Sequence, residues 1–308
     1  MNTDRAILIA GPTASGKSAL ALALAERLTG VVINADSMQV YRELRVLTAR
    51  PSAEDEARAP HRLYGFVPGT EAYSAGRYAG DAAHAIAEAR ASCRVPIVVG
   101  GTGLYFKALL EGLAPVPAIP RGIRDHWRGE AGRVGAEALF AVLSHRDPAM
   151  AARLDPNDPQ RIVRALEVLD ATGRSLAEWQ ESPGKPLLTE EDTVRLVVLP
   201  GREELYRQCE ARFEHMMEHG VVEEVRRLAA LGLDPGLPVM RALGVRPLMQ
   251  LSAGALGRDQ AIERAKADTR QYAKRQVTWL RSNMRAWNTL FEQEIERKLA
   301  QAMTFIRT

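Results

Sequence analysis

The residues with the clearest capacity for chemistry form a glycine-rich loop near the N-terminus, Gly11-Pro12-Thr13-Ala14-Ser15-Gly16-Lys17-Ser18. The loop matches G-x-x-x-x-G-K-[ST] at every fixed position, a pattern whose backbone N–H groups surround an anion. Lys17 supplies a positive charge and the Ser18 hydroxyl can hold Mg²⁺, so we expect a diphosphate-like ligand. Because the loop contacts phosphate oxygens, it leaves open whether the ligand is a nucleotide such as ATP or another diphosphate.

Two further segments could complete a site. Asp36 ends the apolar run Val31–Asp36, and a carboxylate there can act as a general base, bind a metal through water or merely cap the local chain. We favour the general base. The turn Gly100-Gly101-Thr102-Gly103 permits close approach of a ligand to the backbone, although alone it is a weak signal. The sequence shows no strand that ends in an acidic pair, which weakens the hypothesis of an NTP-hydrolysing motor.

The elements around these segments predict a parallel sheet. Short apolar runs at Ala6–Ala10, Val31–Asp36 and Val95–Val99 alternate with helical segments at Ser18–Leu28 and Gly80–Ala91. Gly30 is the expected stop of the first helix. Since the carboxyl ends of parallel strands face one crevice, the loop, Asp36 and the glycine turn should lie together.

A change in the sequence pattern after Leu113 predicts an inserted domain. The segment APVPAIP is rich in proline, and helical patterns follow it until the apolar run Val194–Leu199. We therefore predict an α/β fold with a P-loop NTPase-like parallel sheet core. The core spans 1–115 and 193–308 and ends in basic helices, and 116–192 form an inserted, mostly helical domain. The last twenty residues indicate only a weak helix or tail.

Composition narrows the class of protein. The 308 residues carry a net charge of +3, so any nucleic-acid surface must be a local patch. Cys93 and Cys209 lie far apart, without metal-ligand spacing, and no apolar run is long enough for a membrane span. We expect a soluble, cytoplasmic protein. His126, His145 and His215 show no ligand spacing and receive no role.

The basic patch is predicted on a long amphipathic helix at Asp259–Arg285. Between Arg241 and Arg285 there are ten basic and three acidic residues, and Arg270, Lys274, Arg281 and Arg285 fall within about 60° around a helix. Such a strip suits phosphates, although a solvated helix face is the simpler alternative. Tyr272 and Trp279 are interpreted as core anchors in preference to base-stacking platforms.

Five blocks then resemble one family, the bacterial tRNA dimethylallyltransferases, also called isopentenyl-diphosphate:tRNA transferases. They are GPTASGKS at 11–18, NADSMQVY at 34–41, VGGTGLYFKALLEGL at 99–113, NDPQRIVRALEV at 157–168 and TRQYAKRQVTWLR at 269–281. The blocks occur in the family's order and span nearly the whole chain.

The resemblance implies an enzyme, a prenyltransferase that moves a dimethylallyl group from dimethylallyl diphosphate to N6 of an adenosine next to the tRNA anticodon. Asp36 would accept the proton, while Lys17, Ser18 with Mg²⁺ and Arg241 would neutralise the leaving diphosphate. We expect a monomer with no membrane partner. Residues at which the resemblance or the basic helix implies tRNA contact are Asp36, Ser37, Met38, Gln39, Thr102, Arg124, Gln160, Arg161, Ile162, Val163, Arg164, Arg241, Arg246, Lys274 and Arg281.

Two departures from the family accompany the match. The segment Glu43–Pro51 lacks the family's glycines and has Arg50 in place of a lysine, which puts the loop's shape in question. The zinc finger of eukaryotic relatives is absent. The main alternative function is a P-loop small-molecule kinase in which Arg161 and Arg164 clamp ATP. A non-catalytic RNA-binding module does not explain an intact phosphate loop beside Asp36.

Overall fold

The computed structural model describes residues 5–182 and 184–307. The chain divides into two compact units, one comprising Met1–Leu110 and Leu187–Thr308 and the other Glu111–Pro186. The insertion expected at 116–192 overlaps the second unit. Within the described residues, no helix is both long and apolar enough to cross a membrane.

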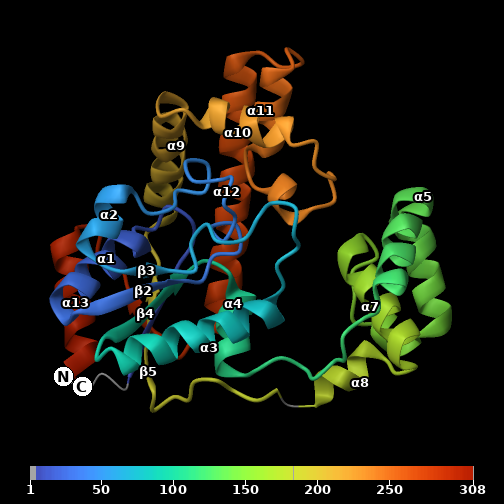
Figure 1. Cartoon of the computed structure of the whole chain (residues 1–308), viewed down its shortest axis with the longest axis horizontal. Helices are drawn as coiled ribbons and strands as arrows, with labels where there is room; N and C mark the ends of the chain where they lie inside the picture. The colour runs from blue at the N-terminus through green and yellow to red at the C-terminus, as the bar shows by residue number, and fades with distance from the viewer. Residues whose placement is uncertain (1–4, 183, 308) are drawn as a thin grey trace. The chain divides into compact units, whose positions relative to one another are not determined.

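The first unit is built on a six-stranded sheet in the order β3-β2-β4-β1-β5-β6, with every strand pair parallel (Figure 1). The predicted α/β class and parallel sheet are therefore confirmed. The two outermost strands were missed because two or three residues carry no readable alternation. The strands are β1 Ala6–Ala10, β2 Gly30–Asn34, β3 His61–Arg62, β4 Val95–Gly100, β5 Thr193–Val198 and β6 Asn288–Leu290.

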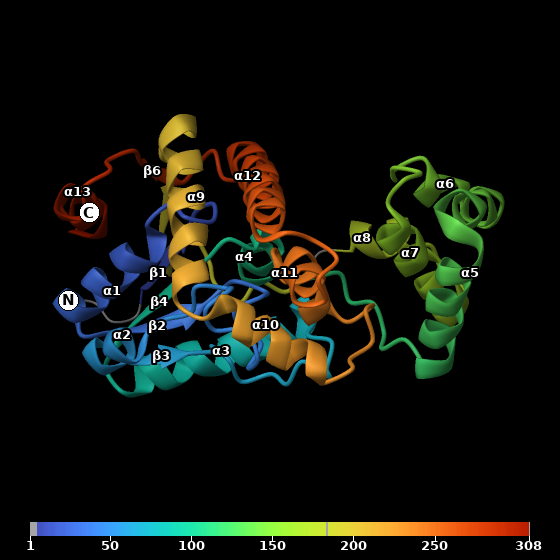
Figure 2. The ribbon, with the colours of Figure 1, turned by 90° about the horizontal axis from the view of Figure 1, so that it is seen from above.

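Helices cover both faces of this sheet, as Figure 2 shows from above. Because side chains alternate along a strand, Ile7 and Ile9 pack towards α1 (Lys17–Leu28) and α13 (Ile295–Arg307), while Leu8 joins the opposite core. That second core includes α3 (Ala75–Ala91) and α4 (Gly103–Leu110). The short α2 spans Ala53–Arg58.

The first helix ends differently from the prediction. Thr29, with φ 54°, is the left-handed cap, and Gly30 is already the first residue of β2. A Cβ at Gly30 would lie 2.7 Å from Ile97 Cδ1 and 3.0 Å from the Val95 carbonyl oxygen. Gly30 therefore serves close strand packing and is not the helix stop.

The carboxyl-terminal part of the first unit is helical. The predicted amphipathic helix is α12, Arg258–Asn283, which buries Ala265, Ala273 and Leu280 and packs against α9. The last residues form a full helix, α13, which packs on α1 and buries Ala302, so the expectation of a weak helix or tail was wrong. The other elements are α9 Arg202–Glu218, α10 Val221–Ala230, the 3-10 turn η1 Pro238–Arg241 and α11 Val245–Ser252.

The second unit has a small core of its own, in which Trp127, Leu143 and Leu166 are buried together. Its longest helix, α5, is interrupted at Gly135, whose φ of 80° is readily adopted only by glycine. The helices are α5 Arg121–Arg146, α6 Pro148–Ala151, α7 Pro159–Thr172 and α8 Leu176–Glu181.

Candidate active site at the carboxyl ends of the strands

The glycine-rich loop connects β1 directly to α1, as the pattern requires. Gly16, at φ 83°, precedes the first helical turn, and the Gly11 N–H donates to the Gly100 carbonyl at 3.3 Å. The latter contact ties the loop to the glycine turn after β4. The helix N-terminus and the free N–H groups of its first turn thus face the crevice where an anion can bind.

Lys17 is buried beneath the loop, where its Nζ donates to the Pro12 carbonyl at 3.1 Å. Burial lowers the pKa of Lys17 to about 8, and the negative charge of Asp36 opposes that shift. The Ser15 hydroxyl is also buried and has no hydrogen-bond partner within the described part of the chain. Ser18 is exposed on the first turn of α1. The loop therefore presents a cation and unsatisfied donors, which suit a diphosphate.

Asp36 lies beside the loop, since its charge acts on Lys17. Its Oδ1 accepts from the Met38 N–H at 2.9 Å, so the carboxylate does stabilise a local turn. No hydrogen bond is recorded for Oδ2 among the described residues, which leaves that oxygen available to a ligand. Thr102 Oγ1 accepts from the Ser37 N–H at 2.9 Å and joins the ends of β2 and β4.

The charge of Asp36 acts on three tyrosines. Burial, and after it the charge of Asp36, raises the pKa of Tyr64, Tyr105 and Tyr272 well above the usual range. Tyr105 also stacks on Tyr78 with ring centroids 3.8 Å apart. Tyr64 packs against the core on the α1 side of the sheet, and Tyr105 belongs to the core on the opposite side. The prediction of Tyr272 as a simple core anchor therefore misses its proximity to Asp36.

An arginine that the sequence analysis missed reaches the phosphate loop. Arg212, on α9, donates to Thr13 Oγ1. Burial lowers the pKa of Arg212, and the nearby Asp36 carboxylate counteracts this effect. Arg241, which was expected to neutralise the leaving group, is exposed on η1 and has no recorded bond to the loop among the described residues.

Gln276 was also missed, although it lies within the block at 269–281. Its Oε1 accepts from the Thr13 N–H at 2.8 Å and its Nε2 donates to the Gly101 carbonyl at 3.0 Å. Only 7% of the side chain is exposed. One amide thus bridges the phosphate loop and the turn after β4. The sequence feature that could have indicated this role is the position of Gln276, a polar residue, on the same helix face as Thr269, Ala273 and Leu280.

The third missed residue is Lys298, in the segment that received no role. Its Nζ donates to the Ser15 carbonyl at 3.2 Å, and a Cβ at Gly16 would lie 2.7 Å from that nitrogen. The side chain is 4% exposed, and burial lowers its pKa. Lys298 therefore holds the loop backbone from α13.

The altered segment 43–50 has a well-defined anchor. The buried Glu224 of α10 accepts three backbone N–H groups, from Arg45 at 2.7 Å and from Val46 and Leu47 at 2.8 Å. Gln39 donates its amide to the Thr48 and Ala49 carbonyls. The Glu224 carboxylate thus fixes the shape of this loop, and the two carbonyl bonds occupy the amide hydrogens of Gln39.

The predicted tRNA-contacting residues of the second unit differ in exposure. Ile162 and Val163 are buried in that unit's core, so their side chains cannot reach RNA. Gln160, Arg161 and Arg164 are exposed on α7. Arg124 donates to the Ile119 carbonyl at 2.9 Å.

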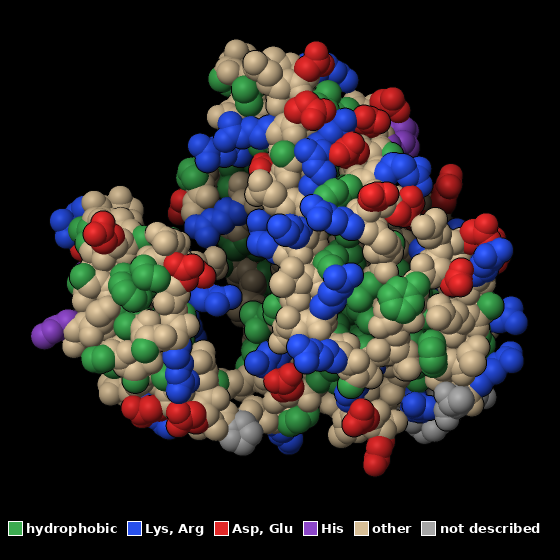
Figure 3. Space-filling model, turned by 180° about the vertical axis from the view of Figure 1, so that it is seen from behind, with side chains coloured by type: hydrophobic (Ala, Val, Ile, Leu, Met, Phe, Trp, Pro, Cys, Tyr) green, Lys and Arg blue, Asp and Glu red, His purple; other side chains and the backbone are tan. Residues whose placement is uncertain are grey.

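The basic strip is smaller than predicted. Arg270 pairs with Glu210, and Arg285 lies beyond the end of α12, where helical geometry no longer applies. Lys274 and Arg281 are exposed on the helix, and Arg246 is exposed on α11. Seen from behind, Lys and Arg side chains gather along α12 (Figure 3). The patch therefore exists in the first unit, with Arg270 committed to an intramolecular ion pair.

A shallow groove of about 550 Å³ follows the same helix. Lys274 and Arg275 lie there beside Trp279, whose ring would be 2.3 Å from a Cβ at Gly103. Trp279 thus packs on the glycine turn with one side and borders the groove with the other. The lining residues are Gln271, Lys274, Arg275, Thr278, Trp279, Ser282 and Asn283.

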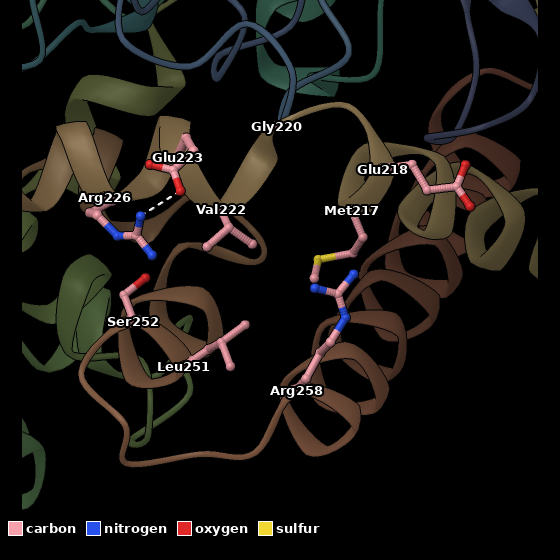
Figure 4. A pocket seen from close by; sticks show the side chains of 9 residues that line it. All are labelled: Met217, Glu218, Gly220, Val222, Glu223, Arg226, Leu251, Ser252 and Arg258. Atoms are coloured by element: carbon pink, nitrogen blue, oxygen red, sulfur yellow. Dashed lines mark hydrogen bonds and ion pairs between the residues drawn. The ribbon is translucent and has the colours of Figure 1, made fainter.

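A second groove, of about 510 Å³, is formed by the ends of α9, α10, α11 and α12 (Figure 4). Arg226 pairs with Glu223 on one side of it, and Arg258 extends past Met217 on the other. None of the phosphate-loop residues lines this groove. It is separate from the catalytic candidates.

A strand-loop-helix anion site beside a carboxylate, at the carboxyl edge of a parallel sheet, defines a P-loop α/β protein. Residues 39–283 match the model of the IPP transferase family, and residues 4–69 match that of isopentenyl transferase. The chain belongs to the IPP transferase family.

Relatives at high identity cover almost the whole chain. It is 53% identical over 302 residues to a tRNA dimethylallyltransferase of Parvibaculum lavamentivorans, covering 98% of this chain and 96% of the relative. It is 57% identical over 280 residues to one of Mesorhizobium japonicum, covering 91% and 87%.

Solved structures agree with the fold. A full-length tRNA isopentenylpyrophosphate transferase from Bacillus halodurans superposes with a TM-score of 0.70 at 31% identity, covering 99% of this chain and 96% of that one. A eukaryotic dimethylallyltransferase acting on tRNA gives a TM-score of 0.82 at 28% identity, covering 98% and 79%.

Proposed function

We propose that this protein transfers the dimethylallyl group of dimethylallyl diphosphate to the N6 amine of the adenosine 3′-adjacent to the anticodon in tRNA. The observation that carries the proposal is the juxtaposition of an intact phosphate loop with Asp36. Bond by bond, the N6 nitrogen attacks C1 of the donor, the C1–O bond breaks, diphosphate leaves and N6 loses a proton.

Asp36 is the proposed proton acceptor. The N6 lone pair is delocalised into the purine ring, so the amine is a weak nucleophile that needs a nearby base. Oδ1 of Asp36 is held by the Met38 N–H, which fixes the side chain and leaves Oδ2 for the amine.

Cations under the loop would stabilise the departing diphosphate. Lys17 is buried and Arg212 is partly buried, and the charge of Asp36 acts on both, so that a fixed positive charge there acts strongly on developing negative charge. Arg241, expected from the resemblance, remains a proposal for the same role. Thr13, which receives Arg212 and is held by Gln276, would orient the loop around the phosphates.

The donor set also fits a magnesium ion. Mg²⁺ prefers oxygen ligands and retains several waters, and the Ser18 hydroxyl and the Asp36 carboxylate supply such oxygens at this edge of the sheet. We propose that Ser18 holds the ion. When bound, it would neutralise charge on the diphosphate.

tRNA would be bound by exposed groups of both units. Lys274, Arg281 and Arg246 in the first unit, and Gln160, Arg161 and Arg164 in the second, are exposed and can contact phosphate or bases. Ser37, Met38 and Thr102 lie at the crevice, where the target base must enter after leaving its stack.

Both cysteines are free, which suits a reducing compartment such as the cytoplasm. A monomer remains our proposal. The kinase alternative is not favoured, because the family match extends over 39–283 and includes the insertion and α12, for which a small-substrate kinase has no use.

The test compares two labelled donors and one variant. Unmodified tRNA with labelled dimethylallyl diphosphate and Mg²⁺ should acquire label, whereas γ-labelled ATP should give none in any acceptor. Asp36→Asn retains an oxygen for the Met38 N–H, so it should bind tRNA normally and lose about 10²–10⁴-fold in transfer rate. Phosphoryl transfer from ATP without isoprenoid transfer would refute the proposal.

A further inference from the structure

Three potential metal ligands outside the phosphate site gather at the end of α9. His215, Glu218 and His219 each offer one ligand atom, and these atoms all lie within 4.8 Å of one another. The spacing i, i+3, i+4 places them on one helix face. The sequence analysis gave His215 no ligand spacing, which was wrong because its partners are the two residues a helical turn further along.

The ring of His219 is oriented by a backbone bond. Its Nδ1 lies 2.7 Å from the His215 carbonyl oxygen. A carbonyl oxygen can only accept, so Nδ1 carries the hydrogen and Nε2 keeps its lone pair. This is the hydrogen bond that typically fixes the tautomer of a metal-binding histidine.

The carboxylate of the trio is not committed elsewhere. Two other α9 glutamates are paired, Glu214 with Lys266 and Glu210 with Arg270. Glu218 has no recorded ion pair or hydrogen bond from its side chain among the described residues, and it points away from Arg258 (Figure 4). The trio also lies at the C-terminus of α9, where the helix dipole favours a cation.

We propose that His215, Glu218 and His219 form a surface site for a transition-metal cation of the zinc type. Two imidazole nitrogens and one carboxylate oxygen select Zn²⁺, Ni²⁺ or Cu²⁺ over Mg²⁺ and Ca²⁺, which prefer oxygen alone. Three protein ligands leave a coordination position for water. None of its three ligands is a residue proposed to hold Mg²⁺ or to act in transfer.

The experiment is an isothermal titration of the full chain with ZnCl₂ in a phosphate-free buffer, without donor or tRNA. We expect one saturable equivalent. His215→Ala and His219→Ala should each weaken it at least about tenfold, and Glu218→Gln should weaken it measurably. All three residues are exposed, so folding should not suffer.

Two controls separate this site from other zinc ligands. His84 forms an i, i+4 pair with Glu88 on α3 but lacks a second histidine, so His84→Ala should leave the titration unchanged. Cys93 is an exposed thiol that could bind zinc on its own. If the titrated site is the proposed one, Cys93→Ser should leave the zinc titration unchanged. At the same zinc concentration, the melting temperature of the wild type should rise by more than that of His219→Ala. Binding of unchanged affinity in His219→Ala, or binding that vanishes in Cys93→Ser, would overturn the proposal.

Discussion

The Gln276 bridge allows a quantitative prediction about how the phosphate loop is held. Gln276→Met keeps most of the side-chain volume and removes both hydrogen bonds, from Thr13 N–H and to the Gly101 carbonyl. The buried Gly101 carbonyl then lacks its bond, at a cost of about 1–3 kcal/mol, and the partly buried Thr13 N–H costs less.

We expect roughly 2 kcal/mol of this cost to appear in donor binding, because the displaced Thr13 belongs to the loop that receives the diphosphate. That energy corresponds to an increase of about 30-fold in KM for dimethylallyl diphosphate. The affinity for tRNA, measured by filter binding without donor, should remain within about twofold, since Gln276 is 7% exposed and offers little to RNA.

The assay is steady-state transfer at saturating tRNA with varied donor, alongside thermal denaturation. Gln260→Met is the matched control, because Gln260 lies on the same helix, is exposed and makes one bond of 3.3 Å to Gly257. If Gln276→Met lowered the melting temperature but left the donor KM within twofold of the wild type, the bridge would serve stability alone and our reasoning about the loop would be refuted.

Three further predictions concern charge. The pKa of Lys17 is about 8, and the lysine must be protonated to bind diphosphate. Donor affinity should therefore be constant below pH 8 and fall by about tenfold per pH unit above it. Donor titrations from pH 7 to 10 measure this, and a flat profile would contradict it. The double variant Lys274→Ala/Arg281→Ala should weaken tRNA binding and reduce the slope of log K against log salt by about 2. The rate of single-turnover transfer should change little. An unchanged slope would mean that these two side chains of α12 do not contact RNA phosphates. Glu224→Ala leaves three backbone donors unpaired, so it should lower the free energy of unfolding, measured by urea titration, by about 3–5 kcal/mol. Glu223→Ala on the same helix is the control and should cost less. Equal losses would mean that the Glu224 carboxylate does not anchor the loop at 43–50.

The sequence predicted what short-range patterns encode. The loop at 11–18 and the strands β1, β2 and β4 follow from consecutive residues, so the strands were recovered with bounds within two residues of those observed. Asp36 could be placed near the loop because the ends of parallel strands share an edge. The short edge strands β3 and β6 were not predicted, because two or three residues are too few to show the alternation of a strand.

The groups that hold the loop could not be predicted in this way. Gln276, Arg212 and Lys298 contact residues 263, 199 and 283 positions away along the chain, and each comes from a different helix. Helical periodicity shows which face is buried but not which distant backbone that face meets. A polar residue on a buried stripe, such as Gln276 among Thr269, Ala273 and Leu280, is the one local sign of such a contact.

The arrangement of these groups also explains why the loop suits a highly charged ligand. Lys17 and Lys298 are buried beside it and Arg212 is partly buried there, and loss of contact with water lowers the pKa of each. The charge of Asp36 acts on Lys17 and Arg212, but one carboxylate cannot balance several cations. A diphosphate would supply the missing negative charge and favour the protonated form of Lys17. Asp36 would then face a neutralised neighbourhood, in which its free oxygen can accept a proton from the incoming amine.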